Sequence, residues 1–461
     1  MLTMKKFSML VSVFVSVFLI APAFGAVPAA APSRERLLMD FGWRFTNGDP
    51  ADVGDTLDYS EGDRLDKATT GEIAAENLRA ASRPDPAAVN LGGTISYVQK
   101  GFQDTGWQTL NVPHDWAVGL GFDRTPKVNT TSRTAARFHQ SHGFRDMDVV
   151  KGTNIGWYRK QFDLPASDAG KTLWVEFDGV YRNSLVWLNG HCLGRYPSGY
   201  SSFFYDITKY AQPGEKNTLV VRVDATKWEG WFYEGAGIYR HVWLVKTNPV
   251  HVAHWGTFVT TALNGNDAVV TIQTQVRDDE ARDAVAGLVS MVTDAEGHTV
   301  AESAPSAVTV SAGRQETVTQ QVRVRNARLW SLESPTLYHV VSTVRKAGAV
   351  VDRYETPFGI RTLKWDPNQG FFLNGRHVVI QGTANHQDHA GVGTAVPDRL
   401  NEYRIEQLKR MGCNAYRCAH GPPTPEVLDA CDKQGMLVMD ETRRMDTTPW
   451  AREQLEALVR R

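Results

Sequence analysis

Short segments of alternating apolar and polar residues, each closed by a two-residue turn, place the strongest constraint on the fold. Residues 173–177 (Leu-Trp-Val-Glu-Phe) run into Asp-Gly, and residues 185–188 (Leu-Val-Trp-Leu) run into Asn-Gly. Such segments and turns predict strands joined as hairpins, so we expect antiparallel sheets over about 36–245. Residues 49–90 interrupt this pattern. They are rich in Ala, Asp and Glu without periodicity, which predicts an insertion or mobile loop.

A second β-rich stretch extends over about 250–362. Two of its segments, 269–276 and 316–324, are long runs rich in Val, Thr and Gln. A domain of about 110 residues built from such strands matches an immunoglobulin-like sandwich in size.

The pattern changes after Lys364, where strands and helices alternate. The expected elements are a strand at 378–380, a helix that Asp398 caps and that runs to Met411 with Gly412 as its stop, a strand at 415–417, a helix from Thr424-Pro425 to near Gly435, and a strand at 436–439. This order predicts a parallel sheet with right-handed crossovers. A closed (β/α) barrel takes roughly 250 residues, whereas about 97 follow Lys364. We therefore expect the chain to end inside this domain.

Composition narrows the class of partner. At 461 residues with 42% apolar residues, the chain is long enough for several domains. Its net charge of -1 argues against nucleic acid or an anionic membrane surface as a partner, and a neutral partner fits better. The four cysteines lack paired spacing, so we expect small buried side chains rather than disulfides or a zinc site.

The N-terminus predicts export. Lys5 and Lys6 precede an apolar run at 7–20 and small residues up to Ala26, the three parts of a secretory signal. A membrane anchor needs about 20 apolar residues, so we expect a signal peptide at 1–26, no membrane association after cleavage, and a periplasmic or extracellular protein.

Polar residues follow each of the three expected strands near the C-terminus. They are Asn385-His386-Gln387-Asp388-His389, then Arg417-Cys418-Ala419-His420, then Asp440-Glu441. Functional side chains gather where parallel strands end, so these groups are expected on one rim. Helix capping and loop hydrogen bonds are the alternative role for any one of them. Three clusters at equivalent positions favour a site.

A metal site is a competing interpretation. Residues 383–389 nearly match the Thr-His-x-His-x-Asp-His ligand motif of metallo-β-lactamases, but Ala384 stands where the first His belongs. The two β domains upstream do not suit that fold either.

The sequence resembles glycoside hydrolase family 2, which contains β-galactosidases, β-glucuronidases and β-mannosidases. The most specific part of the resemblance is residues 412–423 (Gly-Cys-Asn-Ala-Tyr-Arg-Cys-Ala-His-Gly-Pro-Pro), followed by 428–432 and 435–441. Further matches stand in the family's order at 112–116, 156–160, 188–190 and 235–240.

This resemblance implies a multidomain, mostly β architecture. It implies a jelly-roll sugar-binding domain at 27–248, an immunoglobulin-like β-sandwich at 249–362 and the start of a (β/α)8 TIM barrel at 363–461. The implied activity is hydrolysis of terminal β-D-galactosyl residues, with a β-galactoside as partner and no cofactor. A β-glucuronidase, a β-mannosidase and a non-catalytic carbohydrate-binding protein remain alternatives, and a homo-oligomer is compatible with the pattern.

The resemblance also implies roles for individual residues. His386 and His420 would contact sugar hydroxyls, Arg417 would orient the nucleophilic carboxylate, and Asp115 would reach the site from the jelly roll. Asp388 shares a loop with His386 and could accept hydrogen bonds from sugar hydroxyls. For Asp115, capping of a turn is the alternative.

Two departures from the family pattern affect the site. Met445 and Thr447 occupy the positions where some β-galactosidases carry magnesium ligands, so we expect no metal there. Gly421 replaces a bulkier residue after His420, which changes the expected shape of the sugar pocket.

Retaining glycosidases need two carboxyl groups about 5 to 5.5 Å apart. In the family both are Glu, and the acid/base follows an Asn, whereas Asn401-Glu402 is the sole Asn-Glu step here and precedes the signature. Asp440 and Glu441 are neighbours on an extended segment and point to opposite faces. We therefore expect both catalytic Glu residues beyond Arg461, and the chain alone to be inactive.

Overall fold

The computed structural model describes residues 33–53, 57, 85–120, 154–225 and 232–443, together with five residues between 452 and 459. The expected signal peptide at 1–26, Met445, Thr447 and most of the 49–90 segment lie outside the described residues. Within the described ranges, no helix combines the length and apolarity needed to cross a membrane.

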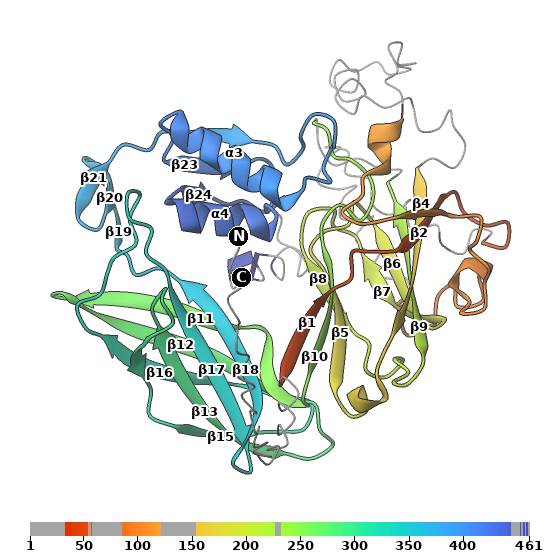
Figure 1. Cartoon of the computed structure of the whole chain (residues 1–461), viewed down its shortest axis with the longest axis horizontal. Helices are drawn as coiled ribbons and strands as arrows, with labels where there is room; N and C mark the ends of the chain where they lie inside the picture. Colours follow the sequence, from red (N-terminus) through yellow and green to blue (C-terminus); the bar gives the residue numbers. More distant parts are fainter. Residues whose placement is uncertain are drawn as a thin grey trace, which may run out of the picture. The chain divides into compact units, whose positions relative to one another are not determined.

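The first domain is a pair of antiparallel sheets with jelly-roll character (Figure 1). One sheet contains, in spatial order, β1 (Arg34–Leu38), β10 (Val242–Thr247), β5 (Thr172–Phe177) and β8 (Phe203–Asp206). The other contains β3 (Gln108–Leu110), β2 (Trp43–Asn47), β4 (Ile155–Asp163), β9 (Lys216–Asp224), β6 (Ser184–Leu188) and β7 (His191–Tyr196). Short 3-10 helices interrupt the connections at η2 (Ser96–Val98), η3 (Trp116–Gly119) and η4 (Ala166–Asp168). The β6–β7 turn has positive φ at Asn189 and Gly190, as the Asn-Gly pair predicts.

Both faces of the six-stranded sheet are covered, which explains why every residue of β6 is buried. On the outer face the rings of Trp157 and Trp187 stack with centroids 5.5 Å apart. The segment around Leu91 and Ile95 packs over them, and the Trp187 indole donates a hydrogen bond to the Leu91 carbonyl at 2.7 Å. The described start of 49–90 also belongs to this packing, because Val53 and Leu57 are part of the same buried cluster and the Trp157 indole donates to Asp49 Oδ1 at 2.8 Å. The prediction of an insertion or mobile loop for the rest of the segment falls outside the described residues.

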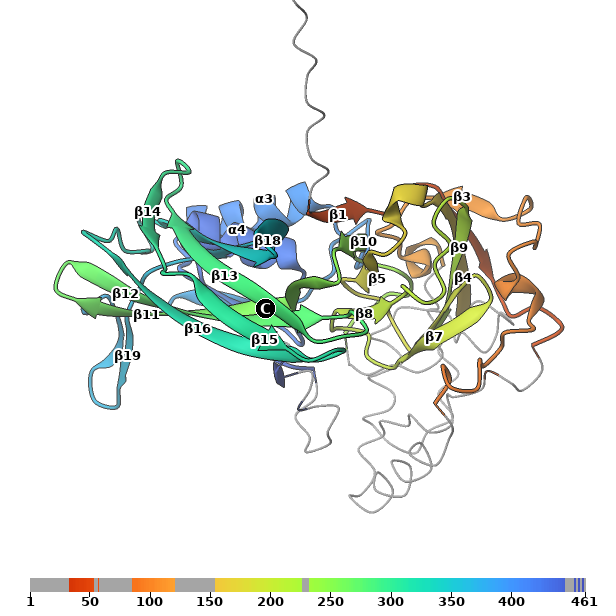
Figure 2. The same ribbon diagram turned by 90° about the horizontal axis from the view of Figure 1, so that it is seen from below.

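The second domain is an immunoglobulin-like sandwich of two antiparallel sheets (Figure 2). One sheet contains β11 (Val250–Asn264), β12 (Asp267–Asp278) and β16 (Gln315–Val324). The other contains β14 (Thr299–Glu302), β13 (Ala284–Thr293), β17 (Tyr338–Lys346) and β18 (Ala349–Phe358), with β15 (Ser306–Val310) paired to β13. Ile272, Val292 and Val340 belong to one buried cluster that joins the two sheets.

The third region begins with a small antiparallel sheet of β19 (Leu363–Asp366), β20 (Gly370–Leu373) and β21 (Arg376–Val378). A parallel sheet follows, with β22 (Gly382–Asn385), β23 (Ala415–Cys418) and β24 (Leu437–Met439) joined by α3 (Asp398–Arg410) and α4 (Pro425–Gln434). The predicted order of strands and helices, and hence the beginning of a (β/α) barrel, is confirmed.

The position of the first parallel strand was predicted wrongly. Residues 378–380 do not form it, because β21 ends at Val378, and Val379 and Ile380 are 62% and 41% exposed. The strand starts at Gly382, where an added Cβ would lie 2.3 Å from the Ala415 carbonyl oxygen. Only glycine permits this close approach of two backbones, and no apolar run announces it in the sequence.

The helix ends differ in how well they follow the prediction. α4 begins after Thr424 and ends at Gly435, which adopts φ 70° as a C-cap, as predicted. Asp398 was expected to cap α3, but the N-cap is Pro397 and Asp398 is the first helical residue. Its carboxylate instead meets His241 of the jelly roll.

Candidate functional site

The carboxyl ends of the three parallel strands meet at one edge of the sheet. β22 pairs with β23 up to Asn385–Cys418, and β23 pairs with β24 up to Arg417–Met439. Segments that follow parallel strands in register leave the sheet side by side. The three polar clusters found in the sequence therefore emerge on the same rim.

Glu441 binds two of the predicted site residues. Its Oε2 accepts a hydrogen bond from Nη2 of Arg417 at 2.9 Å, and its Oε1 lies 2.9 Å from Nδ1 of His420. The carboxylate thus holds a guanidinium from the end of β23 and an imidazole from the following loop in one arrangement. Charge-assisted contacts of this kind are shorter and stronger than neutral ones. This role of Glu441 was not predicted from the sequence.

His386 lies against His420 at the same rim. Their ring centroids are 5.6 Å apart. Burial lowers the pKa of His386, the charge of Asp388 opposes that shift, and His420 adds to it. A lowered pKa leaves the His386 imidazole neutral at pH 7, so it can both donate and accept a hydrogen bond.

An aromatic ring from the jelly roll completes this cluster. The Phe232 ring lies 4.6 Å from His386 and 5.5 Å from His420 between centroids, and the side chain is 4% exposed. The guanidinium of Arg443 lies 5.2 Å from the same ring centroid. The site therefore combines polar groups of the third domain with an apolar surface from the first.

Two arginines hold the loops that carry the histidines. Arg404 of α3 donates from Nη2 to the His386 carbonyl at 2.8 Å. Arg240 of the jelly roll donates from Nη2 to Gln387 Oε1 at 3.2 Å and to the Pro422 carbonyl at 2.7 Å. Both loops are therefore held by side chains outside the loops, one from α3 and one from the jelly roll.

Asp115 is buried and its carboxylate has many partners. Oδ1 accepts from the backbone N–H groups of Ala117 and Ala236, both at 3.0 Å. Oδ2 accepts from the Tyr233 hydroxyl at 2.9 Å and from the Thr394 N–H and hydroxyl at 3.0 and 3.1 Å. Asp115 therefore caps η3, the alternative considered from the sequence, and also binds the loop after β22. Burial raises its pKa and these hydrogen bonds oppose the shift.

A cavity of about 490 Å³ extends along the parallel sheet beside the rim. It is lined by Arg417 and by apolar side chains of β19, β20 and the parallel strands, among them Trp365, Phe371 and Tyr416. Gly421, which departs from the family pattern, lies against Tyr200, whose ring would be 3.1 Å from an added Cβ. A larger residue there would displace the tyrosine.

Family models match this chain in three successive segments. Residues 101–248 match the sugar-binding domain of glycosyl hydrolases family 2, residues 250–361 match the glycosyl hydrolases family 2 model, and residues 367–455 match the TIM barrel domain of that family. The chain belongs to glycosyl hydrolases family 2. The metallo-β-lactamase alternative is therefore wrong, and the near-match at 383–389 consists of the end of β22 and the loop that follows it in a family 2 barrel.

The relatives of this chain include enzymes named for two different activities. A β-galactosidase of Bacteroides ovatus, BoGH2A, is 42% identical over 76% of this chain and 40% of its own length. A β-glucuronidase of Bacteroides fragilis is 32% identical over 65% of this chain and 45% of its own length. A solved family 2 structure from Bacteroides cellulosilyticus has a TM-score of 0.73 at 30% identity, covering 92% of this chain and 49% of that one. The chain thus spans less than half the length of these relatives.

Proposed function

We propose that this chain forms the sugar-binding part of an exported β-galactosidase, a retaining enzyme of family 2. The observation that carries the proposal is the cluster of Glu441, Arg417 and His420 at the ends of the parallel strands. The β-galactosidase of Bacteroides ovatus supports galactose as the sugar. The β-glucuronidase relative makes a glucuronide the second candidate.

Binding would use complementary parts of the rim. His386 and His420 offer ring nitrogens to sugar hydroxyls, and Asp388 offers a carboxylate that can accept two of them. Phe232 is 4% exposed and contacts both imidazoles, so it would support the two histidines rather than stack on the sugar. Arg417, already held by Glu441, would orient the nucleophile of the complete enzyme.

Turnover would need carboxylates that this set of residues does not supply. Both carboxylate oxygens of Glu441 are already engaged, one by Arg417 and the other by His420, so Glu441 acts on these two side chains rather than on a glycosidic bond. Asp440 is its neighbour on the backbone, and its Oδ1 accepts a hydrogen bond from the Glu441 N–H at 2.8 Å, so this carboxylate caps the chain after β24 instead of facing Glu441 across the rim. We therefore propose that residues 1–461 bind sugar without hydrolysing it and that two further glutamates perform the chemistry.

Calorimetric titration of the 461-residue chain with galactose, glucuronate and mannose tests this function. We expect galactose to bind and His420→Ala to abolish the heat, with no release of nitrophenol from an aryl β-galactoside. Preferential binding of glucuronate would favour the second candidate. Binding that survives His420→Ala would indicate a sugar site on the two β domains alone, as expected for a non-catalytic binding protein.

Export is a separate part of the proposal. It rests on Lys5, Lys6 and the apolar run at 7–20. Expression in a bacterial host, fractionation and N-terminal sequencing of the mature protein would test it. A product that stays in the cytoplasm with residues 1–26 intact would contradict it.

A further inference from the structure

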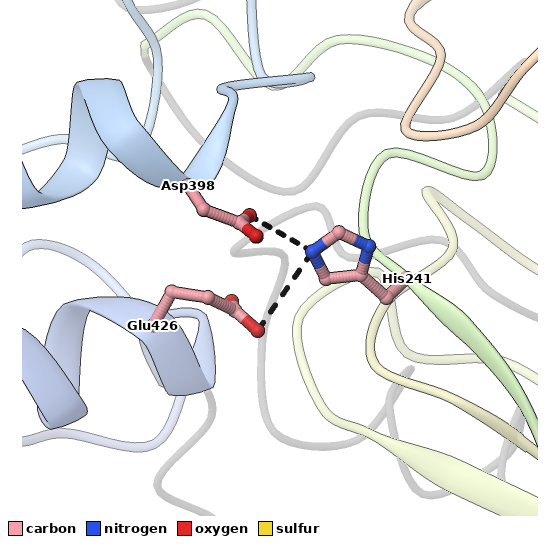
Figure 3. Close-up of side chains that lie close together, drawn as sticks. All are labelled: His241, Asp398 and Glu426. Carbon is pink, nitrogen blue, oxygen red and sulfur yellow. Dashed lines mark hydrogen bonds and ion pairs between the residues drawn. The ribbon is translucent and has the colours of Figure 1, made fainter. Parts of the chain in front are cut away.

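His241 of the jelly roll lies between carboxylates from three segments of the chain, and Figure 3 shows two of them, Asp398 and Glu426. Its Nδ1 is 2.5 Å from Oδ2 of Asp40, which follows β1. Its Nε2 is 2.9 Å from Oδ1 of Asp398 in α3 and 3.8 Å from Oε1 of Glu426 in α4. His241 directly precedes β10, so one imidazole touches the first domain and the first turns of both barrel helices.

The geometry determines the charge of this ring. Ionised carboxylates only accept hydrogen bonds, so a nitrogen that faces one must carry a hydrogen. Both nitrogens of His241 face a carboxylate, which makes the ring an imidazolium. Asp40 is held in place independently, because its Oδ1 accepts from the Val242 N–H at 3.1 Å.

Other charged groups surround His241, and the hydrogen bond from His241 lowers the pKa of Asp398, although burial opposes this shift. Asp398 and Glu426 lie in the first turns of α3 and α4, where the helix dipole favours negative charge. Arg240 of the jelly roll and Arg404 of α3 line the same small cavity as His241. Burial lowers the pKa of Lys160 of β4, and the charge of Asp40 opposes that shift. The His241 side chain is 11% exposed, so water screens its contact with Asp40 only weakly.

We propose that the imidazolium of His241 is a positioning residue that joins the jelly roll to the N-termini of α3 and α4. Each helix follows a loop of the sugar site: α3 follows the loop of His386, and α4 follows the segment that contains His420. The contact therefore sets the distance between those histidines and Phe232 of the jelly roll. This inference goes beyond the proposed function, because it holds whichever sugar the rim binds.

Deprotonation of His241 would remove the contact between the jelly roll and the two helices. Burial lowers the pKa of His241, but hydrogen bonds to Asp398 and Asp40 outweigh it and raise the pKa to about 10. A raised pKa means that the stabilisation is complete below the unfolded value of about 6.5 and is lost as the pH rises through about 10. The contact of His241 with the two helices is therefore stable at neutral pH and is lost in alkaline solution.

Hydrogen-exchange mass spectrometry on the full chain tests the proposal at the level of single helices. In His241→Gln we expect amides of α3 and α4 to lose about tenfold in protection at pH 7, while those of β4 and β9 do not change. In the wild type, protection corrected for the intrinsic exchange rate should fall at α3 and α4 as the pH approaches about 10, and the variant should lack this fall.

Two further variants make the outcome decisive. Asp398→Asn removes the nearer of the two barrel-side charges while leaving the jelly-roll sequence unchanged. Combining it with His241→Gln should cost less than the sum of the two single effects. His298→Gln removes an exposed histidine paired with Asp294 and should leave α3 and α4 unchanged. Unchanged protection of both helices in His241→Gln would overturn the proposal. So would stoichiometric Zn²⁺ binding that depends on His241, because the ring would then be a neutral metal ligand.

Discussion

The carboxylate of Glu441 lies 2.9 Å from Nδ1 of His420, so a residue that follows β24 determines how a histidine that follows β23 is oriented. Because Nδ1 faces a carboxylate, it carries a hydrogen, and the ring's orientation follows from this contact. The proposed sugar contact of His420 thus depends on a carboxylate that need not touch the sugar.

Glu441→Gln should weaken galactose binding about tenfold, about 1.4 kcal/mol, because the neutral amide holds Arg417 and His420 less firmly. Calorimetric titration measures this change. Glu402→Gln on α3 is the matched control, since Glu402 is 47% exposed and pairs with Arg399 away from the rim. Equal affinities of Glu441→Gln and wild type would contradict the role of Glu441.

Phe232→Leu should reduce sugar affinity more than it reduces stability. Leucine keeps most of the buried volume, so a loss of about 1 kcal/mol in stability is expected. The ring that contacts His386 and His420 is lost, so both imidazoles are held less firmly for the sugar. Titration and chemical denaturation of the same preparations separate the two effects. A fall in stability with unchanged affinity would place Phe232 in the core alone.

Asp49→Ala should destabilise the jelly roll by about 3 kcal/mol, because it leaves a buried guanidinium without its main partner. Asp49 accepts from Nε and Nη2 of Arg222 at 2.8 and 2.7 Å and from the Trp157 indole at 2.8 Å. Urea denaturation followed by tryptophan fluorescence measures the loss. Glu215→Ala is the control, because Glu215 is 62% exposed where it pairs with Lys100.

Acid should destabilise the first domain through His114. Burial lowers the pKa of His114 to about 4, and its Nδ1 lies 2.9 Å from the Tyr158 hydroxyl. The unfolded chain therefore binds a proton that the folded chain does not, and stability falls as the pH drops from about 6.5 to about 4, by at most about 3 kcal/mol. Urea denaturation at several pH values should show a smaller acid loss for His114→Gln. Parallel curves for both proteins would refute this assignment.

Much of the fold could be read from local pattern. The alternation at 173–177 became β5, the Asn-Gly pair became the turn after β6, and Gly435 became the left-handed cap of α4. Each of these depends on backbone preferences and on burial within a few neighbouring residues. The polar rim was also predictable, because it follows from where parallel strands end.

Tertiary structure decided what those residues contact. His386, Arg417, His420 and the Asp440-Glu441 step were expected on the rim from the sequence, but the contacts of Glu441 were not. Phe232 was missed, although the aromatic pair at 232–233 before Gly235 was a visible signal. Asp398 was taken for a helix cap, and its carboxylate bonds His241 instead, 157 residues away. The sequence determines backbone conformation through local preferences. The partner of a buried charge depends on tertiary packing, because only the packed domains bring distant groups within hydrogen-bonding distance.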